Sequence, residues 1–279
     1  MKKYRFAIIA VAVAVVLVFA VLRIKRIFSS IRQENSEAAQ FSEPAESFEQ
    51  MLKKAGELAA QGELLVAEEA YRNIIIAYAS RPGIEDIQKK LQDINMCILF
   101  SAIQVPDQTT TRTVKSGDSL SMIADEFHTT AEFIKKQNGL KNDIIRVGMP
   151  LRIWTGRFNV VVDKSQNILT LNSNTEVVRT YRVATGKNNI TPVGNFKIVN
   201  KLKEPSWTHD GKLIPAGSPE NILGTRWLGF DIPGYGIHGT TDPQSIGQQA
   251  TAGCVRMRNN EVEELYDLLP VGTEVAVMD

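Results

Sequence analysis

Residues 238–257 read HGTTDPQSIGQQATAGCVRM, and the rest of the chain is best interpreted outward from this stretch. It places His238 and Cys254 in one short segment, with Gly239 directly after the histidine and Gly253 directly before the cysteine. A cysteine nucleophile needs a neighbouring base or cation and access to solvent. The stretch therefore offers a candidate nucleophile and a candidate base.

Arg256 adds a fixed positive charge two positions after Cys254. A guanidinium group there can favour the thiolate or hold a substrate carboxylate. Gly253 permits a tight turn and close approach of a substrate backbone, and His238 lies in a glycine-flanked strand end, a place that exposes side chains to a cleft. The spacing alone still leaves a buried, unreactive thiol as the alternative.

Composition excludes several other kinds of protein. The formal net charge is +1 and no basic patch is interleaved with aromatic residues, which argues against a nucleic-acid partner. The two cysteines, Cys97 and Cys254, lie far apart, which excludes a disulfide framework and a cysteine-rich zinc site. The three histidines have no clustered second ligand, which argues against a metal enzyme. We expect Cys97, between Met96 and Ile98, to be a packed thiol without chemistry.

Residues 1–28 are predicted to form a transmembrane helix that acts as an uncleaved signal anchor. Residues 7–22 form an uncharged apolar run that follows a basic segment, as in a signal sequence, and the run ends without a good cleavage site. A buried core helix is the alternative, which the apolar character on all sides disfavours. Basic residues flank the run equally, so the positive-inside rule leaves its orientation open.

A polar tether is expected at residues 29–47, followed by a small α-helical region at 48–104. Apolar residues at spacings of three and four form its stripe: Ile84, Ile87, Leu91, Ile94 and Ile98. Four positions faintly resemble a tetratricopeptide repeat: Gly62, Ala67, Tyr71 and Pro82. A single such unit cannot bury both faces, so a helical spacer or a self-association hairpin is the other interpretation.

After a Pro- and Thr-containing linker at 105–111, two short extended stretches, 113–115 and 150–154, bracket two short helices within residues 112–155. Asp118 or Ser119 would cap the first helix, and Thr129 or Thr130 the second. Val114, the SGDSL run at 116–120, Ile123-Ala124, Asn138-Gly139-Leu140 and Val147-Gly148 before Leu151 together resemble a LysM module over its whole length.

The LysM resemblance implies a βααβ fold that binds N-acetylglucosamine-containing glycans such as peptidoglycan. Carried over residue by residue, the sugar would contact the loops at 117–120 and 138–145, with these candidate binding residues: Gly117, Asp118, Ser119, Leu120 and Asn138. Ordinary turn and helix-cap chemistry is the alternative role for such residues. His128, at the end of the first helix, is expected to face the helix dipole rather than a ligand.

Residues 157–279 predict a mainly β domain. Extended runs at 158–162, 168–171, 177–184, 196–199 and 274–277 are separated by polar turns, and one good helix is expected at 259–269. The order of motifs resembles the L,D-transpeptidase catalytic domain of the YkuD type: TPVGNF at 191–196, NILGTRW at 221–227, GYGIHGT at 234–240 and TAGCVRM at 251–257. That resemblance covers nearly the whole domain and implies a sandwich-like β fold.

The same resemblance implies the chemistry. Cys254 would attack a stem tetrapeptide at the bond before its terminal D-Ala, and an amine of a second stem would then attack the thioester. His238 would move the protons, the Gly239 carbonyl would orient it, and backbone N–H groups around Gly253 and Cys254 would hold the oxyanion. Arg256 would help to position substrate or to structure the site, and Tyr235 is a candidate substrate contact. No metal or organic cofactor is required.

One position departs from the family pattern. Many members carry a second histidine before the Gly-Cys pair, and this chain has Ala252 there. His209, in a loop that would rim the cleft, is interpreted as a surface histidine. The alternatives are an L,D-carboxypeptidase, an enzyme that attaches proteins to the wall, and a peptidoglycan-binding scaffold with an inactive catalytic domain. Since both modules indicate peptidoglycan, we expect a single-pass protein of the bacterial envelope with everything after the anchor extracytoplasmic.

Overall fold

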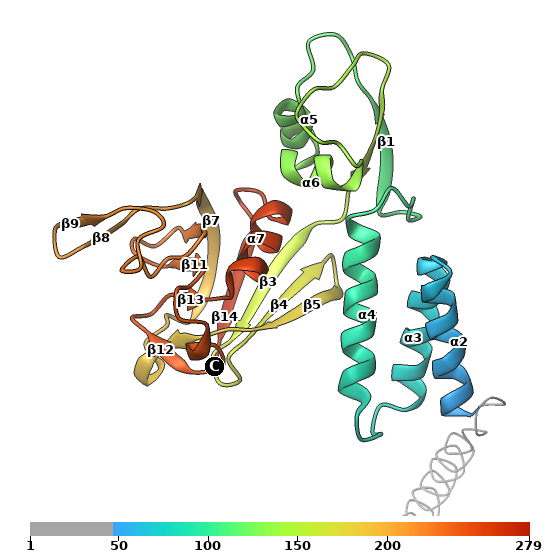
Figure 1. The fold of residues 1–279 in the computed structure, drawn as a ribbon, viewed down its shortest axis with the longest axis horizontal. Helices are drawn as coiled ribbons and strands as arrows, with labels where there is room; N and C mark the ends of the chain where they lie inside the picture. Colours follow the sequence, from blue (N-terminus) through green and yellow to red (C-terminus); the bar gives the residue numbers. More distant parts are fainter. Residues whose placement is uncertain (1–46) are drawn as a thin grey trace, which may run out of the picture. The chain divides into compact units, whose positions relative to one another are not determined.

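The computed structural model describes residues 47–279 (Figure 1). The predicted anchor at 1–28 and all but the last residue of the predicted tether lie outside this range. Within it, no helix is both long and apolar enough to cross a membrane. Residues 52–279 form one compact unit, which holds the candidate active site and the predicted glycan-binding loops.

Helices fill the stretch where the periodicity predicted them, with bounds Phe48–Ala60 (α2), Leu64–Ala77 (α3) and Ile84–Leu99 (α4). Gly62 and Gly83 separate them, and both have the positive φ that glycine adopts without strain (81° and 84°). The predicted isoleucine stripe of α4 is buried at Ile87 and Ile94. Cys97 was expected to be packed, and this was wrong, because its side chain is exposed to solvent.

Helix α4 runs along the edge strand β5 (Glu176–Arg182). The Asn95 amide donates to the Val177 carbonyl oxygen (3.3 Å), and Gln92 Oε1 accepts from the Thr180 backbone N–H (3.1 Å). An exposed strand edge invites pairing with other chains, and these side-chain contacts cover it. The helical region therefore also shields the end of the eight-stranded sheet to which β5 belongs.

Residues 109–154 form a compact βααβ element with its own core. Its bounds are Thr109–Thr113 (β1), Leu120–Phe127 (α5), Ala131–Gln137 (α6) and Pro150–Trp154 (β2), and β1 and β2 are antiparallel. Ser119 Oγ caps α5 and Thr130 Oγ1 caps α6. The first strand begins at Thr109, earlier than predicted, because threonines expected in the linker pair with β2.

The C-terminal region is mainly β, as predicted, with one curled sheet in the order β13-β11-β10-β7-β14-β3-β4-β5. The expectation of a sandwich-like fold is met only in part. The domain is mainly β, but these strands belong to a single hydrogen-bonded sheet and not to two packed sheets. Its bounds, β5 aside, are Phe158–Asp163 (β3), Ile168–Ser173 (β4), Gly194–Lys203 (β7), Arg226–Phe230 (β10), Gly236–His238 (β11), Val255–Arg256 (β13) and Glu274–Met278 (β14). Two short pairs flank it: β6 (Thr185–Gly186) with β12 (Gln249–Thr251), and β8 (Trp207–His209) with β9 (Lys212–Ile214).

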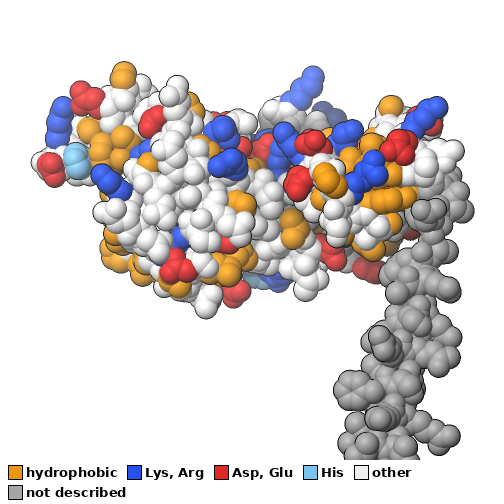
Figure 2. All heavy atoms as spheres, turned by 90° about the horizontal axis from the view of Figure 1, so that it is seen from below, with side chains coloured by type: hydrophobic (Ala, Val, Ile, Leu, Met, Phe, Trp, Pro, Cys, Tyr) orange, Lys and Arg blue, Asp and Glu red, His pale blue; other side chains and the backbone are white. Residues whose placement is uncertain are grey.

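Helix α7 (Asn259–Leu268) packs against this sheet through its predicted apolar face, in which Val262, Leu265 and Leu268 are fully buried. The same core includes Leu99 at the end of α4 and Phe133 of α6. The helical region and the sheet therefore share a hydrophobic core, which Phe133 of the βααβ element joins while most of that element packs in its own core. On the face drawn in Figure 2, acidic and basic side chains are interspersed, so that face carries both signs of charge.

Candidate active site

Two adjacent parallel strands bring the predicted catalytic residues together. Strand β11 pairs with β13 in a register that sets His238 beside Arg256. Cys254 directly precedes β13, and His238 is the last residue of β11. Both line a cleft of about 420 Å³ whose apolar walls include Leu202, Trp207, Ile222, Leu223 and Trp227.

His238 is held as a neutral base. Its side chain is buried, and its Nδ1 lies 2.7 Å from the Gly239 carbonyl oxygen. Because a carbonyl oxygen only accepts, Nδ1 carries the proton and Nε2 keeps a lone pair. Burial lowers the pKa of His238 to about 4, with a further lowering by the charge of Arg256, against the opposing effect of the Gly239 hydrogen bond. The Trp227 ring stacks on the imidazole at 6.1 Å.

Cys254 is a thiol in this arrangement, not a preformed thiolate. Burial raises its pKa, although a backbone hydrogen bond from Gly236 and the charge of Arg256 act in the opposite direction. Its Sγ donates to the Gly234 carbonyl oxygen at 3.3 Å, and within residues 47–279 no hydrogen bond joins it to His238. Proton transfer to His238 therefore requires the thiol to turn away from Gly234.

Thr251 organises the turn that carries the cysteine. Its Oγ1 donates to the Cys254 carbonyl oxygen (2.6 Å) and accepts from the Gly253 backbone N–H (3.1 Å). The Gly253 N–H is therefore already engaged. Among the described hydrogen bonds none uses the Cys254 backbone N–H, which makes it the better candidate for an oxyanion donor at this turn.

Gly253 is required by its surroundings. Its φ is 125°, a conformation that other residues rarely adopt. A Cβ atom at this position would lie 2.7 Å from Cε1 of Tyr235. Tyr235 thus packs directly against the turn that presents Cys254, and its role as a substrate contact stays a prediction.

Arg256 is almost fully buried and turns toward the cleft. Its Nη1 donates to Ser245 Oγ (2.9 Å) and lies 3.9 Å from Asp242 Oδ2. Its Nε is buried and has no hydrogen-bond partner among the described residues. Burial lowers the pKa of Arg256, partly offset by Asp242 and Cys254. Because Nε is buried, a substrate carboxylate would have to meet the guanidinium through the part of Arg256 that lines the cleft.

Asn259 is a positioning residue that the sequence reasoning missed. Its Oδ1 accepts from the backbone N–H groups of Thr240 (2.9 Å) and Thr225 (3.3 Å), and its Nδ2 donates to the Thr240 carbonyl oxygen (2.9 Å). A Cβ atom on Gly224 or Gly239 would lie 2.2 Å from Asn259 Oδ1. Gly224 and Gly239 in the quoted motifs could have indicated a buried polar neighbour, because their missing side chains make room for the Asn259 amide.

The rim of the cleft carries the departure from the family pattern. Ala252 is exposed and lines the cleft with His209, which comes from the β8–β9 hairpin. The His209 ring stacks on Trp207 at 4.5 Å, and its side chain is 58% exposed. The interpretation of His209 as a surface histidine agrees with this exposure.

The candidate sugar-binding residues have their polar groups engaged within the βααβ element. Asp118 accepts from the Lys115 backbone N–H (2.6 Å) and pairs with Arg112 (2.9 Å), two contacts that lower the pKa of its carboxyl group. The Asn138 amide bridges α6 and β2 through Ile134 and Arg152.

The other three candidates of this element are also accounted for locally. Ser119 caps α5 and Leu120 is buried in the core. Gly117 turns with a φ of 87°. These contacts fit turn and cap chemistry; the role in sugar binding stays a prediction.

Comparison with known proteins gives the family. A model described as the L,D-transpeptidase catalytic domain matches residues 157–277, and one described as the LysM domain matches residues 113–154. The putative L,D-transpeptidase YqjB of Bacillus subtilis (strain 168) is 43% identical over 126 residues, which cover 43% of this chain and 70% of that protein. The putative L,D-transpeptidase YkuD of the same strain is 35% identical over 172 residues, 59% of this chain and 96% of that protein.

A solved L,D-transpeptidase from Mycobacterium smegmatis is 21% identical, with a TM-score of 0.39; the match covers 48% of this chain and 65% of that one. The assignment rests on the family models and the two Bacillus relatives, which agree with the order of motifs around His238 and Cys254. The chain belongs to the L,D-transpeptidase family and carries a LysM domain directly before its catalytic domain.

Proposed function

We propose that this protein is a peptidoglycan L,D-transpeptidase that works through a cysteine acyl-enzyme. The observation that carries the proposal is the cleft in which Cys254, a neutral His238 and the partly unpaired Arg256 meet. Nucleophile, base and carboxylate-binding cation are the groups that acyl transfer on a peptide requires. Family membership and the names of the Bacillus relatives support the same reaction.

In the first half-reaction, His238 Nε2 takes the proton from Cys254 Sγ as the sulfur attacks the carbonyl carbon between the third residue and the terminal D-Ala of a stem tetrapeptide. The Cys254 backbone N–H stabilises the oxyanion. His238 then returns the proton to the leaving nitrogen, the C–N bond breaks, and D-Ala departs from a thioester.

In the second half-reaction an amine of another stem attacks the thioester carbon and gives its proton to His238. The C–S bond breaks, and His238 reprotonates the sulfur. A single imidazole serves both halves, so Ala252 does not block the cycle. The product is a cross-link between the third residues of two stems.

The acceptor has alternatives within the same chemistry. Water in place of the amine gives an L,D-carboxypeptidase, and a lysine of a protein gives attachment of that protein to the wall. The apolar side chains that line the cleft favour an organic acceptor over free water. A peptidoglycan-binding scaffold without activity is the non-enzyme alternative, and the preserved site argues against it.

The substrate places the protein in the bacterial cell envelope. Peptidoglycan lies outside the cytoplasmic membrane, so the LysM and catalytic domains would be extracytoplasmic, anchored by the predicted transmembrane helix at 1–28. Tethering and glycan binding would raise the local concentration of the enzyme at the wall.

The test is incubation of the protein with disaccharide-tetrapeptide, followed by mass spectrometry. The expected products are D-Ala and dimers that lack one D-Ala. Tripeptide without dimers would indicate hydrolysis. No reaction, or equal turnover by the Cys254→Ala variant, would exclude the proposal.

A further inference from the structure

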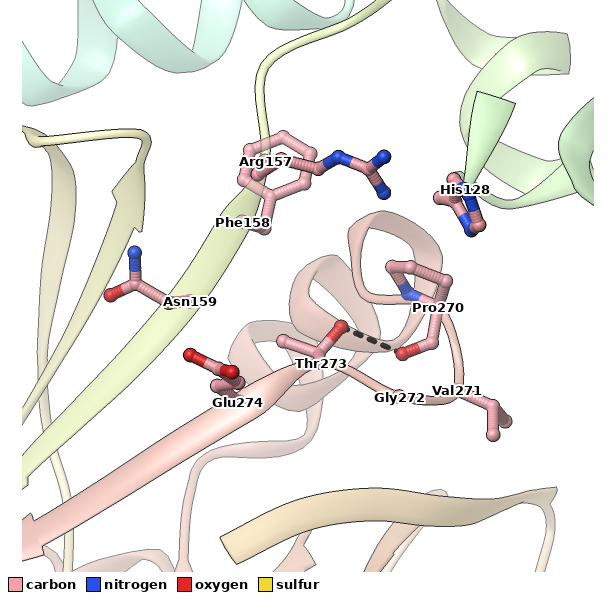
Figure 3. A pocket seen from close by; sticks show the side chains of 9 residues that line it. All are labelled: His128, Arg157, Phe158, Asn159, Pro270, Val271, Gly272, Thr273 and Glu274. Carbon is pink, nitrogen blue, oxygen red and sulfur yellow. Dashed lines mark hydrogen bonds between the residues drawn. The ribbon is translucent and has the colours of Figure 1, made fainter. Parts of the chain in front are cut away.

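A second cavity lies outside the catalytic cleft, where the LysM domain meets the catalytic domain. Its volume is about 370 Å³, within the range of small-molecule sites. It is lined by His128 at the end of α5, by Arg157, Phe158 and Asn159 at the start of β3, and by the loop from Pro270 to the first residue of β14, Glu274 (Figure 3).

Direct contacts fix the two walls of this cavity relative to one another. Lys136 of α6 pairs with the buried Asp267 of α7 (2.6 Å), and Thr130 Oγ1 donates to the Asp267 carbonyl oxygen. Glu132 pairs with Lys203 of β7 (2.7 Å). These contacts hold the α5–α6 corner against the end of α7, so the cavity is part of one packed body.

Unpaired groups of opposite sign face this cavity. Arg157 and Glu274 are exposed, and neither side chain has a hydrogen bond or ion pair with another residue of the described chain. Figure 3 shows the Arg157 guanidinium and the His128 ring directed toward one another above Pro270. Glu274 lies on the opposite side, beside Asn159, its partner in the β14–β3 register.

This arrangement selects a zwitterion. The Arg157 fork with the neighbouring His128 suits a carboxylate, and the Glu274 carboxylate suits an ammonium group. Phe158 and Pro270 add apolar surface to the lining of the same cavity. A phosphate polymer carries only negative charge, and Glu274 would repel it.

We propose that this cavity is a second peptidoglycan-binding site, which takes the diamino acid of a stem peptide through its carboxylate and amine. The identity of the ligand rests on the proposed function, whereas the charge pattern does not. Such a site would hold a stem attached to the glycan that the LysM domain binds, without presenting it to Cys254. Two weak contacts on one polymer would add affinity for the wall.

The binding test uses the full chain with Cys254→Ala to prevent turnover, and a stem tripeptide that ends in a diamino acid. The methyl groups of Val271 line this cavity and not the catalytic cleft, so their NMR signals report on it selectively. We expect saturable shifts of these signals. Arg157→Ala and Glu274→Gln should each weaken the apparent affinity about tenfold, the loss expected for one charged pair.

The controls separate the possible outcomes. Lys89→Ala removes a charge from the exposed face of α4 and should leave the titration unchanged. Shifts of equal affinity with the N-acetylated tripeptide, or shifts with glycerol phosphate in place of the tripeptide, would overturn the proposal, as would no shift at all. D-Ala release by the Arg157→Ala protein that retains Cys254 should stay unchanged. Turnover by the protein with Cys254, without Val271 shifts in the Cys254→Ala protein, would refute this site alone. Val271 shifts without turnover would refute the proposed function alone.

Discussion

The catalytic cleft and the predicted glycan-binding loops were both located from motifs, but the polar groups of their residues differ in how far neighbouring protein groups engage them. In the cleft, His238 Nε2, the Cys254 N–H and Arg256 Nε have no protein partner among the described residues. In the LysM loops, the carboxylate of Asp118 and the amide of Asn138 are engaged by neighbouring residues.

This difference distinguishes motifs whose residues serve chemistry from motifs whose residues stabilise the fold. A residue whose polar atoms remain free in a cavity is available for chemistry, whereas a residue whose polar atoms are satisfied within its own element defines the fold. We therefore expect substitutions in the cleft to reduce catalysis more than stability. Substitutions at Asn138 should reduce stability more than function.

The largest effect is expected for His238→Gln. Without its base, Cys254 keeps a raised pKa and stays a thiol at neutral pH. D-Ala release should fall by about 10² to 10⁴-fold, measured as kcat on disaccharide-tetrapeptide. A loss below threefold would show that another group deprotonates Cys254. His209→Gln, at the exposed rim, is the matched control and should retain most of the activity.

The pH dependence of stability tests the buried state of His238. Its pKa is about 4 in the folded protein, against 6.5 for the ordinary imidazole. Below pH 6.5 the unfolded chain therefore binds a proton that the folded chain does not. The free energy of unfolding should fall by about 3 kcal/mol as the pH drops from 6.5 to 4, and this stability is fully present above pH 6.5.

Urea unfolding at a series of pH values measures this effect. The His238→Gln variant lacks the titrating group, so its stability should change less between pH 6.5 and 4. Parallel pH profiles for the two proteins would contradict the assignment.

Asn138→Ala tests the LysM side of the comparison. It removes three hydrogen bonds, two with Arg152 of β2 and one with Ile134 of α6, and unfolding should become easier by about 2 kcal/mol. Binding of the folded variant to glycan chains without peptides should be unchanged. Asn142→Ala, in the exposed loop nearby, is the control. Lost glycan binding with unchanged stability would show that Asn138 contacts the sugar.

Asn259→Ala is expected to have the smallest effect on stability, about 1 kcal/mol, because its site is only half-buried. It should lower kcat more than it raises KM, since it releases the segment that orients His238. Asn260→Ala removes the exposed neighbouring amide and should change neither quantity. Steady-state kinetics measure kcat and KM for both variants. Equal kcat values for Asn259→Ala and Asn260→Ala would refute the positioning role of Asn259.

Local patterns gave the main elements but not the whole site. The strands at 158–163 and 168–173 and the helix at 259–268 follow from apolar periodicity and turn residues, and the resemblance named Cys254 and His238. The short strands β11 and β13 have too few residues for a pattern, and their pairing depends on distant partners. Asn259 escaped notice because its role comes from contacts with Gly224 and Thr240, far away in sequence.

The most direct test of the account is a search for the covalent intermediate. The protein is mixed with stem tetrapeptide, quenched with acid within the first turnover and digested, and the peptide containing Cys254 is examined by mass spectrometry. The account predicts a thioester at Cys254 with the mass of the stem tripeptide acyl group, reduced strongly by His238→Gln and absent in Cys254→Ala. Release of D-Ala by the Cys254→Ala protein, or an acyl group on another residue, would contradict it.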